Sequence, residues 1–135
     1  MNAFIVDLKN RPGELARITE TVAAKGINLT GFSGATCGDS GTVVLTTDDE
    51  AGIRRVLTDG KFPFKENELV VTAIPDGPGS LAKIARRLAD AGVNIEAALP
   101  TGMAGSKVHV AFATDNPSKA KSAVSEWLAM ATSDR

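Results

Sequence analysis

The chain has 135 residues and a formal net charge of −1, with acidic and basic side chains interspersed. It therefore has no basic face that could neutralise a run of phosphates, and with 4% aromatic residues it has few rings for stacking on bases, so we expect no nucleic-acid partner. The hydrophobic content of 43% is ordinary for a globular protein. We expect a folded chain whose core is built from Val, Ile, Leu and Ala.

The single cysteine, Cys37, can form neither an internal disulfide nor a zinc cage. The sequence shows no basic N-terminal region followed by an apolar run, and no stretch approaches the roughly 18 apolar residues that span a bilayer. We therefore expect a cytoplasmic protein with no membrane partner, no metal site and no cofactor.

The first copy of an internal repeat opens with alternating apolar residues at Phe4, Val6 and Leu8, the period of a half-buried strand. The strand runs into the pair Pro12-Gly13. A helical stripe follows, formed by Leu15, Ile18, Val22 and Ala23. The helix is expected to end before Gly26, which can take the left-handed conformation.

A hairpin is expected next, with strands at about 28–35 and 43–47 joined by the turn CGDSG. Thr47 and Glu50 have the spacing of a capping box, so they predict the start of a second helix. A short strand is expected near Phe62 to Phe64.

The second copy follows the same order. A strand over Leu69, Val71 and Ala73 leads into Pro78-Gly79, and a helix with Leu81, Ile84, Leu88 and Ala89 ends before Gly92. Strands at about 94–99 and 108–114 flank the turn TGMAGS. Asn116 before Pro117 predicts a capped helix start, and the last helix is expected to carry Ala120, Val124, Trp127 and Leu128.

The repeat is explicit between Asn10–Leu29 and Asp76–Ile95, which are offset by 66 residues. Eight of the eighteen pairs from Pro12 to Leu29 are identical, whereas chance would supply about one. A period of this length suits a small domain rather than a solenoid unit. We expect two modules, at 1–66 and 67–135.

The second module is expected to lack its last strand, because residues 132–135 are too few and too polar to form one. Seven strands are then expected in place of eight. Two alternatives stay open: the segment from Phe62 to Glu68 is shared between the halves, or the second sheet offers an open edge to a partner chain.

The sequence has few side chains that could act in catalysis. The only histidine, His109, lies in a predicted strand, and neither it nor Cys37 has an evident acid or base partner. Glu14, Glu20 and Asp90 are expected on solvated helix surfaces, without a role. We expect no enzyme.

The strand-to-helix loops are better candidates for a site. A glycine at the first turn of a helix leaves backbone N–H groups without helical partners, and these suit a small carboxylate. An adjacent Asn offers both a donor and an acceptor to the rest of a zwitterion. Taken alone, a Pro-Gly pair more often marks only a tight turn, but here two such loops occur, each followed by a Gly-x-Asn turn.

These motifs resemble the ACT domain family, the small regulatory modules attached to enzymes of amino-acid metabolism, and they resemble a tandem pair of them. The resemblance rests on LKNRPGELARI with KGINL and on IPDGPGSLAKI with AGVNI, and it covers nearly the whole chain. It implies an α+β fold of two ferredoxin-like βαββαβ modules side by side, each with strand order 4-1-3-2 and both helices on one face.

The resemblance also implies that an effector such as serine binds at the seam between modules, to the loop of one module and the Asn of the other. Carried over by position, the first set of ligand-binding residues is Asn10, Arg11, Pro12, Gly13 and Leu15 with Asn94. The second set is Asp76, Gly77, Pro78, Gly79 and Leu81 with Asn28. Leu15 and Leu81 face the core by period, so each would only border a pocket.

The copies diverge where Asn10-Arg11 is replaced by Asp76-Gly77. Asp76 would repel the carboxylate of an amino acid unless it met the ammonium, so we expect the Asn10 site to bind more tightly. The alternative is that Asp76 only caps the following helix. Asn28 and Asn94 have a similar alternative, in which each side chain bonds its own backbone and stabilises the turn.

The sequence therefore predicts a non-catalytic regulatory protein that binds a small amino-acid effector. Its expected protein partners are a second copy in a homodimer, a separate target enzyme or regulator, or both. Two alternatives are an interaction module with vestigial pockets, which would use its exposed sheet edge to add a strand from a partner, and an enzyme of unusual type.

Overall fold

The computed structural model describes residues 1–129. The chain divides into two compact units, unit 1 (Met1–Asn67) and unit 2 (Glu68–Arg135). Unit 1 contains β1 (Asn2–Lys9), α1 (Glu14–Ala23), β2 (Leu29–Cys37), β3 (Ser40–Thr47) and α2 (Glu50–Asp59). Unit 2 contains α3 (Ser80–Asp90), β5 (Ile95–Ala104), β6 (Lys107–Thr114), α4 (Pro117–Ala123) and the 3-10 helix η1 (Ser125–Trp127). Strand β4 (Phe64–Pro75) begins in unit 1 and continues into unit 2.

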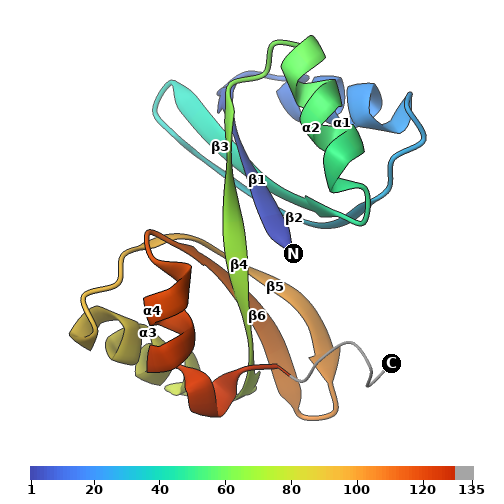
Figure 1. The fold of residues 1–135 in the computed structure, drawn as a ribbon. Helices are drawn as coiled ribbons and strands as arrows, with labels where there is room; N and C mark the ends of the chain where they lie inside the picture. The colour runs from blue at the N-terminus through green and yellow to red at the C-terminus, as the bar shows by residue number, and fades with distance from the viewer. Residues whose placement is uncertain (130–135) are drawn as a thin grey trace. The chain divides into compact units, whose positions relative to one another are not determined.

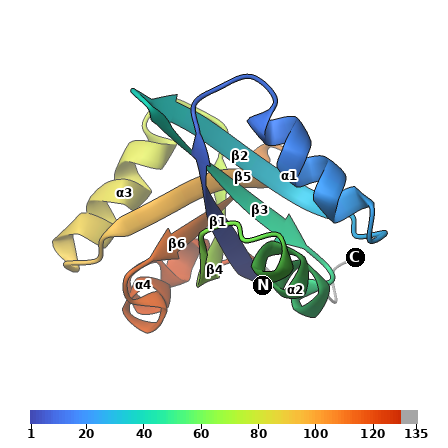
Figure 2. The same cartoon turned by 90° about the horizontal axis from the view of Figure 1, so that it is seen from above.

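The strands of unit 1 lie in the order β2-β3-β1-β4, which is 4-1-3-2 when it is read from the other edge. Strand β3 pairs antiparallel with β1 and with β2. In unit 2 the order is β4-β6-β5, and β6 pairs antiparallel with both neighbours. The helices of unit 1 cover one face of its strands (Figure 1), and α3 and α4 lie on the same side of β4 and β6 (Figure 2). The predicted α+β, ACT-like ferredoxin-type fold is confirmed.

The core of unit 1 forms where the alternating strand residues meet the helical stripe. Phe4 and Val6 of β1 cluster with Ile18 and Val22 of α1 and Ile53 of α2, and all five are at most 1% exposed. Unit 2 repeats this pattern with its own residues, namely Val70, Ile74, Ile84, Leu88 and Phe112. Burial of such aliphatic and aromatic side chains is the main stabilising contribution in each unit.

The helix ends depend on glycine as predicted. Gly26 and Gly92, which follow α1 and α3, have φ angles of 73° and 75°. Only glycine takes this left-handed conformation at little cost. The chain can therefore reverse after each helix and enter the next strand.

The second helix of unit 1 is capped differently from the expectation. Its N-cap is Asp49, whose side chain accepts from the Gly52 amide at 2.9 Å. Thr47 instead accepts from the Asp49 amide and donates to the Asn28 carbonyl at 2.7 Å. The predicted capping box of Thr47 and Glu50 is therefore wrong, because the hydroxyl is engaged by the neighbouring turn.

The structure contains six strands within residues 1–129, not seven. The segment expected as a strand at 62–64 and the first strand of the second copy form one continuous strand, β4. Pro63 lies just before it and accepts from the Asp7 amide at 3.0 Å. Glu66, in the polar part of β4, pairs with Arg54 at 2.7 Å. Hydrogen bonds and ion pairs thus order this stretch, and β4 passes from one unit into the other, as the alternative of a shared segment expected.

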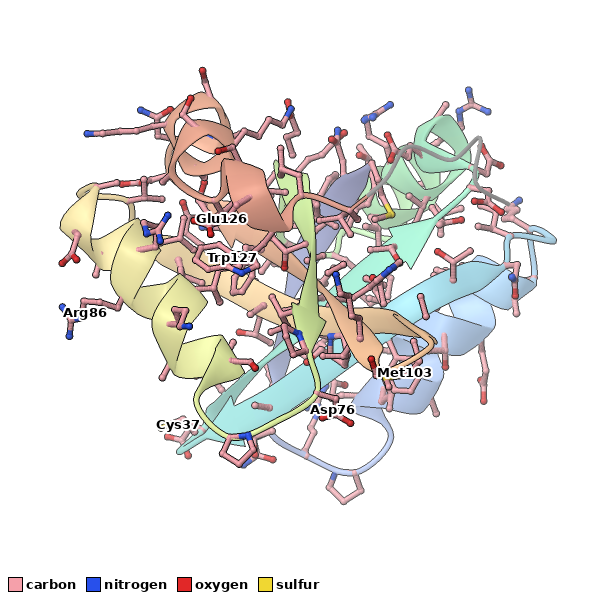
Figure 3. The ribbon with its side chains drawn as sticks, turned by 90° about the horizontal axis from the view of Figure 1, so that it is seen from below. Cys37, Asp76, Arg86, Met103, Glu126 and Trp127 are labelled. Atoms are coloured by element: carbon pink, nitrogen blue, oxygen red, sulfur yellow. The ribbon has the colours of Figure 1, made fainter. Side chains whose placement is uncertain are left out.

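The end of unit 2 also differs from the prediction. The cap by Asn116, which accepts from the Lys119 amide at 3.1 Å, is confirmed, but α4 ends at Ala123 and not beyond Leu128. Trp127 points from η1 toward α3 (Figure 3), where the Arg87 guanidinium lies 4.7 Å from its ring centroid and 2.6 Å from Glu126. These contacts hold the last turn against α3.

The edge of β4 is partly covered by the chain itself. Leu128 forms an antiparallel bridge with Thr72, and the Ala129 amide donates to the Val71 carbonyl at 2.9 Å. The segment at 132–135, expected to be too short for a strand, lies outside the described residues. This part of the β4 edge is therefore not open to a partner strand.

Candidate functional site

The two strand-to-helix loops have nearly the same backbone. The N-cap of α1 is Gly13, with φ and ψ of 89° and −7°, and that of α3 is Gly79, with 84° and −8°. The amides of Asn10 and Asp76 donate to the hairpin-turn carbonyls of Asp39 and Ser106, at 3.0 and 3.1 Å. The repeat in the sequence is therefore a repeat in local geometry.

Neither of these helix starts is capped by a side chain in the part of the chain that the structure describes. Within residues 1–129 no side chain accepts from the first turn of α1 or of α3. By contrast, α2 and α4 are capped by Asp49 and Asn116. The alternative that Asp76 only caps its helix is therefore wrong. The first-turn amides of α1 and α3 carry the partial positive charge of the helix dipole.

Polar side chains around the first loop form hydrogen bonds and ion pairs with other groups of the same chain. The Asn10 Nδ2 donates to the Gly38 carbonyl at 2.8 Å, which leaves its side-chain oxygen as an acceptor. Glu14 is not solvated as expected, since it is 7% exposed. Its carboxylate pairs with Arg11 at 3.2 Å and with Arg17 at 3.1 Å. Arg11, a predicted ligand contact, is thus committed to an internal ion pair.

The Glu14 ion pairs predict a pH effect on stability. The hydrogen bond from Arg17, with a further one from Arg11, holds the pKa of the Glu14 carboxyl below its usual value despite desolvation. A carboxyl group whose pKa is lower in the folded state than its unfolded value of about 4.3 stabilises the protein at pH values above that unfolded value. This stabilisation is lost as the pH falls through the folded pKa. Glu14→Gln should therefore melt below the native protein at pH 7, and the gap should narrow toward pH 3. A gap that stays constant across this range would contradict the assignment.

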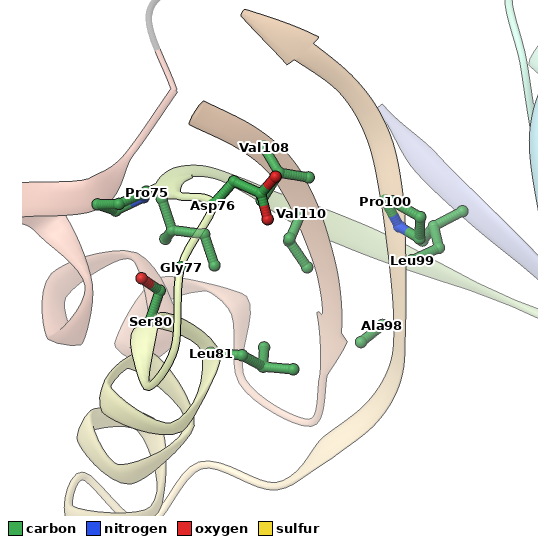
Figure 4. Close-up of a pocket in the computed structure, with 11 residues that line it drawn as sticks. Pro75, Asp76, Gly77, Ser80, Leu81, Ala98, Leu99, Pro100, Val108 and Val110 are labelled. Carbon is green, nitrogen blue, oxygen red and sulfur yellow. The ribbon is translucent and has the colours of Figure 1, made fainter. Parts of the chain in front are cut away.

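The second loop borders a cavity of about 280 Å³ within unit 2 (Figure 4). Asp76, Gly77, Ser80 and Leu81 contribute from the loop and the start of α3. The other walls come from the strands, with Ile74 and Pro75 of β4, Ala98, Leu99 and Pro100 of β5, and Val108 and Val110 of β6. The Asp76 carboxylate makes no hydrogen bond or ion pair with any other residue in 1–129, although the Asp76 amide is bonded to Ser106. A free carboxylate thus stands at the rim of an apolar cavity.

The expectation that Leu15 and Leu81 face the core is wrong. Their exposed fractions are 51% and 56%, because the buried stripe of α1 runs through Glu14, Ile18 and Val22 and that of α3 through Ile84 and Leu88, and each leucine lies beside its stripe. Leu81 lines the cavity instead. The strand residues of the cavity, Ala98 among them, were not predicted as site residues.

Asn28 and Asn94 are both exposed. The Asn28 carbonyl accepts from Thr47, and the Asn94 amide donates to the Asp115 carboxylate at 2.9 Å. Within the described part of the chain neither side chain forms the backbone bond that the turn-stabilising alternative requires. Their contact with a ligand remains a prediction.

Among the described residues, the side chains suited to metal binding are not clustered. In residues 1–129 no three His, Cys, Asp or Glu side chains are placed to hold a metal ion. Cys37 is exposed at the end of β2, and His109 is half-buried in β6. None of the helices described reaches the length and apolarity needed to cross a bilayer.

The fold and the paired loops define a class, the ACT-like ferredoxin-type module. No protein-family model and no curated protein matches the chain. Among solved structures, it is similar to protein BT0572 from Bacteroides thetaiotaomicron, with 26% identity, a TM-score of 0.75, and coverage of 93% of this chain and 86% of that one.

Two further similar structures are regulatory subunits of aspartate kinase. The subunit from Thermus thermophilus, in its ligand-free form, has 16% identity and a TM-score of 0.62, over 93% of this chain and 90% of that one. The subunit from Thermus flavus has 18% identity and a TM-score of 0.62, over 93% and 91%. At these identities the likeness concerns the fold. The resemblance to ACT modules is thereby supported, and these neighbours are regulatory rather than catalytic.

Proposed function

We propose that this protein is a non-catalytic regulator that binds a small amino acid at its strand-to-helix loops. The observation that carries the proposal is the cavity before α3, where a free Asp76 carboxylate lies beside a helix start that has no side-chain cap. The amides of the first turn would receive the α-carboxylate of the ligand, and Asp76 would accept from its ammonium. The negative carboxylate of the zwitterion would thus meet the positive helix end, and its positive ammonium would meet the negative Asp76.

The proposal agrees with the regulatory role of the aspartate kinase subunits that share the fold. An amino acid has about 7 to 10 heavy atoms, and the ceiling of about −1.5 kcal/mol per atom allows micromolar affinity. Such a ligand acts on a partner protein by favouring one arrangement of the regulator, with a coupling of about 1 to 3 kcal/mol. The partner would be a second copy or a separate target enzyme.

Thermal melting of the full chain with each of the twenty amino acids tests this function. At about 100 times its Kd, a ligand that binds only the folded state adds about 2.7 kcal/mol and raises the midpoint by several degrees. At least one amino acid is expected to do so. A melt that no amino acid shifts would sink the proposal and favour the interaction-module alternative.

A further inference from the structure

The two loops differ in the size of the side chains around them. At the offset of 66 residues, the cavity-lining Gly77, Ser80 and Ala98 correspond to Arg11, Glu14 and Phe32. All three positions are small in the second copy and large in the first. Two other lining residues, Leu99 and Pro100, are larger than their counterparts Ser33 and Gly34, so the added space lies on the side of the loop, α3 and Ala98.

The larger side chains of the first copy lie in different surroundings. Glu14 is buried and held by Arg11 and Arg17. Phe32 pairs across β2 and β3 with Leu45, a core residue, so its side chain lies on the helix-facing side of the sheet. It is nonetheless 69% exposed, because it lies on the edge strand.

Ala98 has the same placement in the second copy. It pairs with Phe112, a core residue of unit 2, and so it also faces the helix side. A phenylalanine at this position would extend into the space that Leu81 and Val110 border (Figure 4). The alanine is therefore the side chain that leaves the cavity open on the β5 side.

The walls of this cavity restrict what can enter. Among the described residues, Asp76 is the one charged side chain that lines it, and Ser80 is the one hydroxyl. No described Lys, Arg or His lines it, so an acidic ligand side chain would find no cation there. A basic or hydroxylated side chain could reach only Ser80 and Asp76, which the ligand ammonium engages, and it would otherwise lose water against aliphatic walls. An aliphatic side chain loses nothing and removes apolar surface from water.

We propose, building on the proposed function, that each chain binds one effector, that it binds at the loop before α3, and that it is an α-amino acid with an uncharged aliphatic side chain. Ala98 is the specificity-determining residue. The volume of about 280 Å³ is slightly below the range for drug-sized ligands, about 300–1,000 Å³, which suits a molecule of amino-acid size. This assignment reverses the ranking expected from the sequence, in which the Asn10 loop was the tighter site.

Titration calorimetry on the full chain tests the inference with leucine, valine, alanine, lysine, aspartate and serine. Leucine and valine are expected to bind with one site per chain. Alanine should bind at least about tenfold more weakly, since each buried methylene contributes up to about fourfold. Lysine, aspartate and serine should be weaker still. Ala98→Phe should weaken leucine binding at least about tenfold, whereas the matched change Phe32→Ala should alter it less than about twofold.

Three outcomes would overturn the inference and leave amino-acid sensing intact. They are two sites per chain, loss of binding in Phe32→Ala, and lysine or serine binding as tightly as leucine at a site that Ala98→Phe blocks. Binding of no amino acid would overturn both proposals. Should Ala98→Phe melt far below the native protein, the smaller change Ala98→Val decides. It should weaken leucine binding by an intermediate factor, and unchanged binding would contradict the inference.

Discussion

Replacing Asp76 by alanine is expected to weaken amino-acid binding by about 10- to 150-fold, the value of one charge-assisted hydrogen bond. The carboxylate lies at the rim of the cavity and has no partner among residues 1–129, so it is free to accept from a ligand ammonium. Because Asp76 is exposed, the effect should lie near the lower end of this range. Calorimetry with the best-binding amino acid measures it.

Two control variants make the Asp76 test specific. Asp76→Asn keeps an acceptor but removes the charge, so it should bind with intermediate affinity. Asn10→Ala changes the counterpart residue of the first loop, whose side chain donates to Gly38, and it should leave the affinity nearly unchanged. If Asp76→Ala bound as tightly as the native protein, the ammonium could not be placed at this carboxylate.

The largest stability effect is expected in the core of unit 2. Ile84 is 0% exposed and packs in the cluster with Leu88 and Phe112. Ile84→Ala removes buried methyl and methylene groups and leaves a cavity, which costs about 2 to 5 kcal/mol. A module of this size has a total stability of roughly 3 to 10 kcal/mol at 0.05 to 0.15 kcal/mol per residue. Urea denaturation should therefore show a large fall in the midpoint.

Leu81→Ala, on the same helix, is the matched control. The helical period placed Leu81 and Ile84 on one stripe, but the structure leaves Leu81 56% exposed. Its truncation should change the unfolding free energy by no more than about 0.5 kcal/mol. Ile84→Val should fall between the two, at about 0.5 to 1.5 kcal/mol. Equal losses at positions 81 and 84 would contradict the placement of the helix on its sheet.

The contrast between Leu81 and Ile84 shows what periodicity can predict. A period of 3.6 gives the direction of a side chain around the helix axis, and it identified the α3 stripe correctly. It does not show how wide the buried stripe is. In α1 that stripe runs through Glu14, Ile18 and Val22, so Leu15 at its side is exposed, and Leu81 has the equivalent position beside Ile84.

Residue type alone predicted the turns after the helices, but it did not predict the start of α2 or the continuity of β4. Gly26 and Gly92 were placed correctly, because only glycine readily takes a left-handed conformation. The start of α2 was not, because Thr47 and Asp49 are both good caps and only the adjacent turn decides between them. The continuity of β4 was left undecided between two alternatives, because the hydrogen bonds and ion pairs that order it, such as Arg54 with Glu66, come from elements distant in sequence.

The candidate site was predicted in part. The repeat and its glycines located both loops, but the absence of a side-chain cap at α3 came from the structure, since the sequence left capping by Asp76 open. The cavity requires the register of β5 with β6, which places Ala98 opposite Phe112. A signal was nevertheless present in the repeat, because Ala98 and Phe32 occupy equivalent positions and differ greatly in size.

Amide chemical-shift mapping of the full chain by NMR shows where an effector binds. On addition of leucine, the largest shifts are expected on the amides of Gly79 and Leu81 at the start of α3, because the Ser80 amide already donates to the Gly77 carbonyl at 3.3 Å. The amides of Gly52 and Lys119, already bonded to Asp49 and Asn116, should stay unchanged. Saturating leucine that leaves the start of α3 unperturbed, or that shifts the capped helices instead, would contradict binding at the loop before α3.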